Sequence, residues 1–587
     1  MDLSHPPLSV PPGPLAESNE IDRRIRAALG RATGSLSVGS ALLAAGDWAI
    51  NLLVSPGKRF ELALLAVEYA QQVARYDVEC MLAGPGVATR RHVEPPARDR
   101  RFEDDAWLHW PFNVLHQSFL LYEQWWDAAT RGVLGVDRKH ENLVSFAARQ
   151  WLDLASPSNN LFTNPVAMKR TLAEGGLNLL RGGQNFLTDV QRLAAGLPPP
   201  GAEEFVVGRN VAVTPGKVVL KNRLMELIQY SPATAEVCPE PVLLVPAWIM
   251  KYYILDLSPN SSLVKYLVDQ GHTVFCISWK NPTVEERDVT MDDYVSLGMR
   301  AALDAVTAIV PERKVHVLGY CLGGTMATIG AAAMARDGDD RLASLTLLAA
   351  QTDFSEPGEL GLFIDESQVS LLEAQMAQTG YLTSGQMAGA FHLLRSNDLL
   401  WSRLINQYLL GETDQVNDLM AWNADATRLP ARMHSDYLRH LFLHDDLAQN
   451  RFRVDGRPVS LADLRIPVFL LGTLTDHVAP WRSVYKLHYL TGAEITCALT
   501  SGGHNAGIVN PPGNPRRHYQ VMKSAAGERR LDPDRWLATA ADNKGSWWPA
   551  WHEWLRERSG APVQPPRMGL PGARALDDAP GHYVLEK

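Results

Sequence analysis

The sequence is poor in cysteine and has no surplus of basic residues. Its 587 residues include five cysteines, which lack both the close spacing of a zinc site and the density of a disulfide framework. These are Cys80, Cys238, Cys276, Cys321 and Cys497. The formal net charge of −9 argues against a general nucleic-acid-binding protein, because such proteins neutralise phosphates with lysine and arginine. We therefore expect a protein of a reducing compartment with no nucleic-acid partner.

Long apolar runs are also missing. No stretch of the sequence approaches the roughly 18 to 20 apolar residues that span a bilayer, so we expect no transmembrane segment. The first twenty residues, MDLSHPPLSVPPGPLAESNE, have neither the basic start nor the apolar centre of a secretory signal. Their proline and serine content predicts a disordered N-terminus over residues 1–20, and a cytoplasmic location is the simplest interpretation.

The length of the chain predicts more than one domain, because a single hydrophobic core rarely grows this large. Hydrophobic residues make up 46% of the chain and charged residues 21%, which is typical of globular proteins. Over residues 21–200, apolar residues recur at three- and four-residue spacing, which predicts a mainly helical N-terminal domain. The turn-rich stretch GLPPPGAEE then marks a domain boundary near residue 200.

After this boundary the pattern changes to short apolar runs that alternate with amphipathic helical patterns. The runs are PVLLVPAWI from residue 241, HTVFCISW from 272, KVHVLGY at 314–320, LASLTLLAA at 342–350 and IPVFLLGT at 466–473. They predict a mainly parallel sheet covered by helices on both faces over residues 201–587. A mainly helical insertion at about 352–450 lies where a lid would sit, and an ordinary structural cap is the alternative.

The stretch GYCLG at residues 319–323 places a cysteine between a predicted strand and a predicted helix. It fits the pattern G-x-nucleophile-x-G, in which the glycines avoid collisions on a tight turn. This layout indicates an α/β-hydrolase-type fold with Cys321 as nucleophile, since a helix N-terminus stabilises a thiolate. The backbone N–H of Leu322 would donate to an oxyanion, and a second donor is expected at Ala247 or Trp248. A buried structural cysteine is the alternative for so short a motif.

Two further residues complete a catalytic arrangement. In this fold the acid and the histidine follow the nucleophile along the chain, each at the end of a strand. Asp476 follows the run IPVFLLGT, and His504 lies in SGGHNAG after a further strand-like segment. We therefore predict a Cys321–His504–Asp476 triad that needs no metal and no cofactor. His477 is a candidate for a supporting role, and a metal site of Asp476, His477 and His504 is the alternative.

Taken together, longer motifs of the chain resemble those of polyhydroxyalkanoate (poly-3-hydroxybutyrate) synthases, most closely the class I type that acts without a second subunit. The resemblance is carried by RQWLDLASPSNNLFTNP, KYYILDLSPNSSLVKYLVDQGHTVFCISWKNP, GYCLGGT, TDFSEPGELGLFI, TDHVAPW, SGGHNAGIVNPP, KGSWWPAWHEWL and APGHYV. One departure is visible, since family members often have INK before YYILDL, where this chain has Ile249-Met250-Lys251. Asp256 of YYILDL matches a position associated with the active-site region, and a structural acid is the alternative.

The resemblance implies an acyltransferase that polymerises (R)-3-hydroxyacyl-CoA, such as 3-hydroxybutyryl-CoA, into a polyester with release of CoA. It assigns the triad to Cys321, His504 and Asp476 through a covalent cysteine thioester, and it implies a homodimer at the surface of cytoplasmic polymer granules. The residues themselves leave two alternative functions open. One is a thioesterase or polyester depolymerase on the same scaffold, and the other is a non-catalytic, granule-associated scaffold protein.

Overall fold

The chain divides into two units in a computed structural model, which describes residues 14–84, 86–96, 99–387, 389, 401–413, 415–574 and 576–587. The sheet unit comprises Met1–Leu36, Gly201–Ala388 and Asn417–Lys587, and the helical unit comprises Ser37–Pro200 and Gly389–Val416. One division therefore falls between Pro200 and Gly201, but the units differ from the predicted domains at two other places.

The first difference concerns the N-terminal residues. Residues 1–13 of the predicted disordered segment lie outside the described residues, and helix α1 (Pro14–Ala32) begins at a proline, which is well suited to a first helical turn. Residues 14–20 are thus helical, contrary to the prediction. Helix α1 belongs to the sheet unit because it packs against α12 (Glu366–Thr379), where Arg31 donates a hydrogen bond to Gln378 at 2.8 Å.

The second difference concerns the insertion, part of which belongs to the helical unit. The short helix η9 (Leu404–Leu409) packs along α7 (Leu177–Ala194). The side-chain amide of Asn178 donates to the carbonyl of Leu409 at 2.7 Å, and that of Asn185 donates to the carbonyl of Gln407 at 3.1 Å. The insertion at about 352–450 is therefore not one continuous cap on the sheet.

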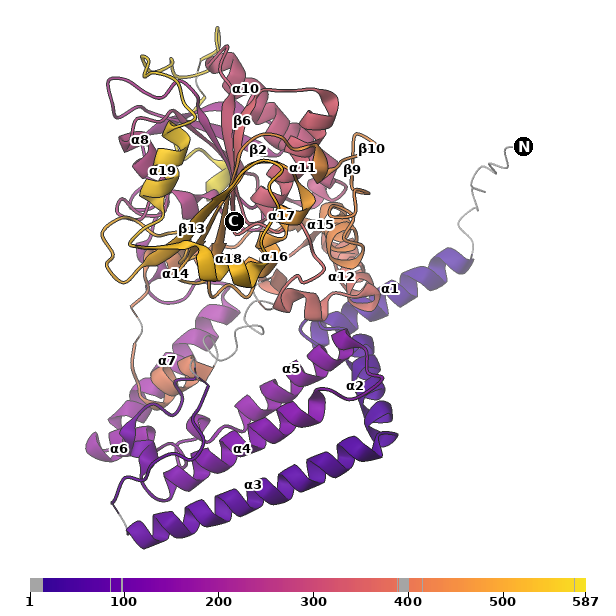
Figure 1. The fold of residues 1–587 in the computed structure, drawn as a ribbon, viewed down its shortest axis with the longest axis vertical. Helices are drawn as coiled ribbons and strands as arrows, with labels where there is room; N and C mark the ends of the chain where they lie inside the picture. Colours follow the sequence, from indigo (N-terminus) through magenta and orange to yellow (C-terminus); the bar gives the residue numbers. More distant parts are fainter. Residues whose placement is uncertain are drawn as a thin grey trace. The chain divides into compact units, whose positions relative to one another are not determined.

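A ten-stranded sheet forms the centre of the sheet unit (Figure 1). Its order is β1-β2-β4-β3-β5-β6-β11-β12-β13-β14, in which the six central strands from β4 to β12 are parallel and the outer pairs are antiparallel. The bounds are β1 Gly216–Lys221, β2 Met225–Tyr230, β3 Val242–Val245, β4 Val274–Trp279, β5 Val315–Tyr320, β6 Leu342–Leu348, β11 Val468–Thr473, β12 Ile495–Thr500, β13 His518–Ser524 and β14 Ala541–Lys544. The mainly parallel sheet of the predicted fold is thereby confirmed.

The outer strands do not appear in the sequence as apolar runs. β13 and β14 are half-exposed or exposed along most of their length, and their residues are largely polar. β2 is fully buried, yet it contains Glu226 and Gln229. Backbone N–H groups of His582 and Tyr583 donate to Glu226 at 2.8 and 2.9 Å, and the ammonium of Lys221 pairs with the same carboxylate at 2.7 Å, so this buried charge is both paired and hydrogen-bonded.

Helices cover both faces of this sheet, with α8 and α19 on one side and α10 and α11 on the other (Figure 1). The helices of the sheet unit are α1 Pro14–Ala32, α8 Leu263–Asp269, α9 Met291–Asp293, α10 Ala301–Ile309, α11 Leu322–Asp337, α12 Glu366–Thr379, α14 Asp418–Ala424, α15 Ala431–Tyr437, α16 Trp481–Tyr485, α17 Leu487–Leu490, α18 Pro533–Thr539 and α19 Trp548–Arg556. Tryptophans of α19 anchor it, because the indole N–H groups of Trp551 and Trp554 donate to Thr346 and Thr496 in the sheet, each at 3.0 Å.

Four short strands lie outside the central sheet, in two pairs. They are β7 Tyr381–Leu382 with β8 Leu429–Pro430, and β9 Arg453–Val454 with β10 Arg457–Pro458. The pair β7 and β8 joins two parts of the insertion that are separated in sequence by the segment assigned to the helical unit. This pairing joins the two parts of the insertion that belong to the sheet unit.

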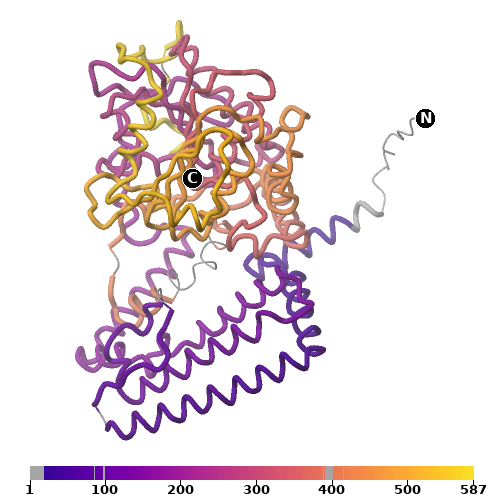
Figure 2. Tube along the Cα trace, in the orientation of Figure 1, coloured from indigo at the N-terminus to yellow at the C-terminus, as the bar shows by residue number. Residues whose placement is uncertain are grey.

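The helical unit consists of amphipathic helices that pack on one another, and Figure 2 shows α3, α4 and α5 running side by side. Its helices are α2 Val38–Leu53, α3 Pro56–Ala83, α4 Phe112–Thr130, α5 Arg138–Leu154, α6 Pro165–Ala173, α7 Leu177–Ala194 and η9 Leu404–Leu409. Among the residues described here, no single helix is long and apolar enough to cross a membrane. The pair α2 and α3, bent by 89°, meets those criteria of length and composition only when both helices are taken together.

Several histidines of the sheet unit are buried as neutral rings. Burial lowers the pKa of His272 to about 3 and that of His316 to about 4. His272 is hydrogen-bonded to His552 at 3.0 Å, and His316 to the hydroxyl of Ser344 at 2.7 Å. Protonation of either ring would place a charge in the core, so both resist it.

We expect this burial to make the protein sensitive to acid. Because the pKa of His316 is lower in the folded state than in the unfolded chain, stability is complete above about pH 6.5 and falls as the pH approaches about 4. One such histidine contributes about 3 kcal/mol to this loss. Urea unfolding at stepped pH should show a weaker pH dependence for His316→Gln than for the wild type. His518→Gln, which replaces an exposed histidine, should leave the dependence unchanged, and equal slopes for all three proteins would contradict the expectation.

Candidate active site

Cys321 lies on the turn between β5 and α11 and adopts a backbone conformation that is rare for a side chain with a Cβ atom. Its φ is +53° and its ψ is −124°. The N–H of Cys321 donates to the carbonyl of Leu348 at 2.9 Å, and its carbonyl accepts from Gly324 N at 2.9 Å. These bonds hold the strained turn, which places the sulfur at the carboxyl end of the parallel strands.

The glycines of the motif permit a close approach between this turn and its neighbours, as the motif predicts. A Cβ atom on Gly319 would lie 2.3 Å from the Cα of Gly324. A Cβ atom on Gly323 would lie 2.1 Å from the carbonyl oxygen of Val245 and 2.6 Å from the carbonyl carbon of Pro246. The first turn of α11 is therefore pressed against the loop that follows β3.

Asp476 and His504 meet at the same edge of the sheet because they follow β11 and β12, which are parallel neighbours. His504 Nδ1 and Asp476 Oδ2 are 2.8 Å apart, and the side chains are 11% and 0% exposed respectively. The carboxylate also accepts hydrogen bonds from the hydroxyl of Thr473 and from the N–H groups of Val478 and Ala479, each at 2.9 Å. The side chain of Asp476 is thus fully buried, and its carboxylate oxygens have hydrogen-bond partners. It is therefore a rigid acceptor for a histidine ring.

The electrostatics of the three groups are coupled. Burial acts to lower the pKa of His504, but the Asp476 carboxylate, which is hydrogen-bonded to the ring, and the nearby Cys321 sulfur raise it well above its usual range. Burial acts to raise the pKa of Asp476, but His504 and the hydrogen bonds from Ala479 and Thr473 hold it below its usual value. The structure thus brings together Cys321, His504 and Asp476, with the imidazole between the sulfur and the carboxylate.

The residues predicted to supply the oxyanion donors lie at the start of α11 and in the loop packed against it. Leu322 is the first residue of α11, and the contact of Gly323 with Pro246 places the Pro246–Ala247 peptide against that helix start. Within the part of the chain that the structure describes, no acceptor pairs with the N–H groups of Leu322, Ala247 or Trp248. These N–H groups are therefore available to an oxygen that gains negative charge beside Cys321.

The two supporting candidates lie in different surroundings. His477 is half-buried next to Asp476, and its carbonyl accepts from the N–H of Glu359 at 3.2 Å. Asp256 is buried and accepts hydrogen bonds from Thr214 and Ser262 at 2.5 and 2.7 Å, and burial raises its pKa. These contacts favour a structural role for Asp256, because neither hydroxyl belongs to the candidate site.

Sequence reasoning missed three polar neighbours of the triad. The hydroxyl of Tyr320 donates to Asn505 at 2.6 Å, and its ring centre lies 5.6 Å from that of His504. Burial and the Cys321 sulfur raise the pKa of Tyr437, which places this insertion residue within electrostatic reach of the sulfur. Tyr320 and Asn505 adjoin predicted site residues in sequence, so adjacency could have found them, but nothing in the sequence pattern links Tyr437 to residue 321.

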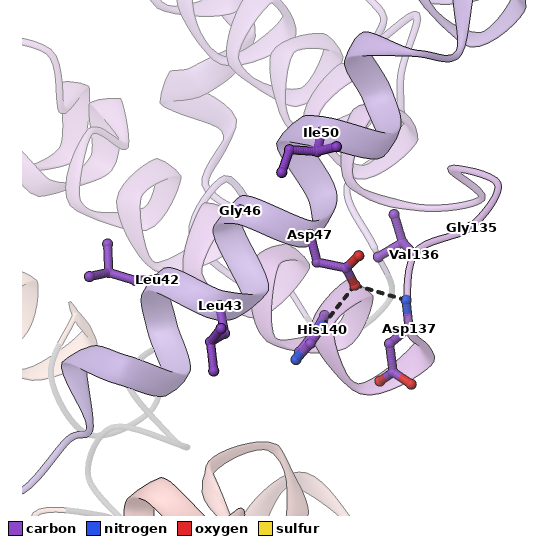
Figure 3. Close-up of a pocket in the computed structure, with 9 residues that line it drawn as sticks. All are labelled: Leu42, Leu43, Gly46, Asp47, Ile50, Gly135, Val136, Asp137 and His140. Carbon is purple, nitrogen blue, oxygen red and sulfur yellow. Dashed lines mark hydrogen bonds and ion pairs between the residues drawn. The ribbon is translucent and has the colours of Figure 1, made fainter.

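Two other features of the surface lie apart from these residues. His440, His444 and Asp446 offer ligand atoms within 4.8 Å of one another, a spacing that could hold a metal ion, but both carboxylate oxygens already accept bonds from His440 and Arg451. In the helical unit, a hollow beside α2 contains an ion pair of Asp47 with His140 at 2.7 Å (Figure 3). Its lining residues are Leu42, Leu43, Gly46, Asp47, Ile50, Gly135, Val136, Asp137 and His140.

We expect Asp476→Asn to lower the pKa of His504, because it removes the negative charge that contributes most to raising it. The measurement is a titration of the His504 ring by NMR with isotope-labelled histidine. Thr473→Val is the matched control, since it removes one hydrogen bond to the same carboxylate and leaves the charge in place. An unchanged His504 pKa in Asp476→Asn would contradict the coupling described above.

Three family models match parts of the chain. Residues 16–58 match a family described as "Poly-beta-hydroxybutyrate polymerase N terminal", residues 98–267 match "Poly-beta-hydroxybutyrate polymerase (PhaC) N-terminus", and residues 240–511 match "alpha/beta hydrolase fold". Among solved structures, a monoacylglycerol lipase of Paleococcus ferrophilus is 15% identical with a TM-score of 0.31, covering 55% of this chain and 98% of that chain. The fold assignment rests on the family match and on the sheet rather than on so low a score.

Two curated relatives cover most of the chain. A poly(3-hydroxyalkanoate) polymerase of Methylorubrum extorquens is 40% identical over 508 residues, which are 86% of this chain and 83% of that protein. The poly(3-hydroxyalkanoate) polymerase subunit PhaC of Cupriavidus necator is 39% identical over 503 residues, which are 84% of each chain. At this identity and coverage, with an α/β-hydrolase sheet behind the candidate site, the chain belongs to the poly(3-hydroxyalkanoate) polymerase family.

Proposed function

We propose that the protein is an acyltransferase that polymerises (R)-3-hydroxyacyl-CoA, with 3-hydroxybutyryl-CoA as its expected substrate, into polyester and releases CoA. The covalent carrier of the acyl group is a thioester on Cys321. One observation carries the proposal, namely that Cys321 on a strained elbow lies near His504, whose ring is hydrogen-bonded to the buried carboxylate of Asp476. Family membership supplies the polymer and the substrate class.

The first half-reaction exchanges one thioester for another. A His504 ring that carries a proton stabilises negative charge on the Cys321 sulfur, which attacks the thioester carbonyl of the acyl-CoA. The carbonyl oxygen becomes negatively charged and accepts hydrogen bonds from the N–H of Leu322 and from Ala247 or Trp248. The C–S bond to CoA then breaks, His504 gives its proton to the departing CoA sulfur, and the acyl group remains on Cys321.

The second half-reaction lengthens the chain. The 3-hydroxyl of a hydroxyacyl-CoA loses its proton to His504 as its oxygen attacks the thioester carbonyl on Cys321. An ester bond forms, the C–S bond to Cys321 breaks and its sulfur leaves as a thiolate beside the protonated ring, while the lengthened chain keeps the CoA thioester of the incoming unit. Asp476 keeps the ring oriented and stabilises its positive charge. Repetition of the two steps adds one unit and releases one CoA each time, and no step requires a metal or a cofactor.

Water must be kept from the acyl-enzyme, because hydrolysis would end the cycle. Cys321 is only 9% exposed, and Tyr437 of the insertion lies within electrostatic reach of it. Both observations support a covering role for the insertion residues that belong to the sheet unit.

We expect Cys321→Ala to abolish both CoA release and polymer formation from 3-hydroxybutyryl-CoA, since the acyl carrier is lost. The assay measures free thiol over time and analyses the product by gas chromatography after methanolysis. Cys238→Ala is the matched control, because Cys238 is also 9% exposed and is not in contact with the triad. This variant should retain wild-type activity.

The other outcomes separate the alternative functions. Free 3-hydroxybutyrate without polymer from the wild-type protein would identify a thioesterase, and breakdown of added polyester would identify a depolymerase. Undiminished CoA release by Cys321→Ala would show that this cysteine is not the acyl carrier. A wild-type protein that binds polymer but releases no CoA would be a granule-associated scaffold.

We further propose that the chain acts as a homodimer at the surface of polymer granules, as the family resemblance implies. Light scattering coupled to size-exclusion chromatography should show a dimer. Sedimentation with isolated polyester particles should remove the protein from solution together with the particles. A protein that stays monomeric and unbound through both measurements would contradict this proposal.

A further inference from the structure

A short part of the insertion, residues 422–427, lies along the loop that follows β3. We call residues 422–427 the cap segment and residues 246–251 the donor loop. The hydroxyl of Thr427 donates to the carbonyl of Trp248 at 2.9 Å, and the indole N–H of Trp422 donates to the carbonyl of Lys251 at 2.8 Å. Between these two bonds, Met250 pairs with Ala426 as an isolated antiparallel bridge. The cap segment therefore contacts the donor loop at three successive places.

The same cap segment also contacts the loop that bears the histidine. The side-chain amide of Asn505, the residue after His504, donates to Asn423 at 3.2 Å. Asn505 in turn accepts the hydroxyl of Tyr320, the residue before Cys321, at 2.6 Å. One six-residue stretch thus contacts both sides of the candidate site.

Further bonds fix the ends of this arrangement. The hydroxyl of Tyr253 donates to Asp425 at 3.0 Å, just beyond the donor loop. The ammonium of Lys251 is buried and donates to the carbonyl of Glu586 at 2.6 Å, so the C-terminal segment holds the donor loop from a second direction. A loop bound on two sides has few alternative conformations.

We propose that the cap segment positions the oxyanion-hole backbone of the donor loop, with Thr427 as the positioning residue. This inference rests on the proposed function, because it assigns Thr427 a role in the acyl transfer at Cys321. Thr427 does not touch the reacting atoms. It acts through the Trp248 carbonyl, which accepts a hydrogen bond from its hydroxyl.

The physical argument starts from the burial of the Thr427 bond. Thr427 and Trp248 are each 2% exposed, so no water can replace the hydroxyl as partner of the Trp248 carbonyl. A peptide group is planar, so this bond fixes the Trp248–Ile249 peptide, which directly follows the backbone that carries the N–H groups of Ala247 and Trp248, and it restricts the conformations open to that backbone. Donors accelerate acyl transfer only when they already point to where the negative oxygen forms.

Met250 stands where family members often have the Asn of INK, and this difference is compatible with the contacts between the cap segment and the donor loop. Met250 pairs with Ala426 through a backbone bridge, which does not depend on the side chain at residue 250. The side chains that carry the hydrogen bonds, Thr427 and Trp422, come from the cap segment. A different side chain at residue 250 therefore leaves the position of the donor loop unchanged.

The test compares Thr427→Val with Thr427→Ser. Valine keeps the shape of threonine and removes the donor, whereas serine keeps the hydroxyl. We expect kcat for CoA release from 3-hydroxybutyryl-CoA to fall at least about tenfold in Thr427→Val with KM changed less than about twofold, because the lost interaction acts on the transition state. Thr427→Ser should stay within about threefold of the wild type.

Thr491→Val is the control for a merely structural effect. Thr491 is buried, and its hydroxyl donates to the carbonyl of Leu464 at 3.1 Å and accepts from the N–H of Ala493 at 3.1 Å, so the variant loses a bond of the same type and one more, away from both loops of the site. Its melting temperature should fall at least as much as that of Thr427→Val, with kcat unchanged. Hydrogen exchange of the peptide covering residues 246–253 should accelerate in Thr427→Val and not in Thr491→Val.

The outcomes distinguish this inference from the proposed function. A wild-type protein that releases no CoA would overturn the proposed function, whereas the hydrogen-exchange result would still decide whether Thr427 holds the donor loop. Wild-type kcat in Thr427→Val, or a kcat loss that Thr491→Val reproduces, would overturn the inference and leave the triad in place. Unchanged exchange at residues 246–253 would overturn it as well.

Discussion

The candidate site depends on the close approach between the first turn of α11 and the loop after β3. Gly323 leaves no room for a Cβ atom beside the carbonyl of Val245, so the helix start and that loop are held at backbone contact distance. This contact brings the N–H of Leu322 and the Pro246–Ala247 peptide to the same side of Cys321. The strained φ of Cys321 is a consequence, because the chain must reverse direction between β5 and α11 without moving either of them.

The electrostatic arrangement follows from sheet topology. β11 and β12 are parallel neighbours, so the segments after them emerge at one edge and bring Asp476 to within 2.8 Å of His504. A carboxylate with no exposed surface would be costly if it stood alone, but three donors besides the histidine satisfy it. The resulting negative field outweighs the effect of burial on His504 and keeps its pKa raised, which a solvent-exposed acid could not do as strongly.

The central strands and the order of the predicted triad residues along the chain could be read from the sequence, because each has a recognisable local pattern. Strands such as β3, β4 and β5 are buried on both faces and therefore read as continuous apolar runs. β2 could not be found in this way, because it contains the buried Glu226, which pairs with Lys221 and accepts hydrogen bonds from backbone N–H groups of residues 582 and 583. Likewise the split of the insertion between two units rests on contacts such as Asn178 with Leu409, which lie 231 residues apart. Spacing within one segment carries no information about such partners.

The contact of the cap segment with both loops bears on why sulfur suits this site. Under the proposed mechanism the acyl group waits on Cys321 as a thioester, which stays reactive towards a hydroxyl but is also open to water. A cover that only excluded water could lie anywhere above the sulfur. Residues 422–427 instead bond to the donor loop through Thr427 and to the His504 loop through Asn423, so displacing them would disturb the oxyanion donors and the base together. A site built in this way is least active when it is most open to water, and this coupling favours transfer of the acyl group over its hydrolysis.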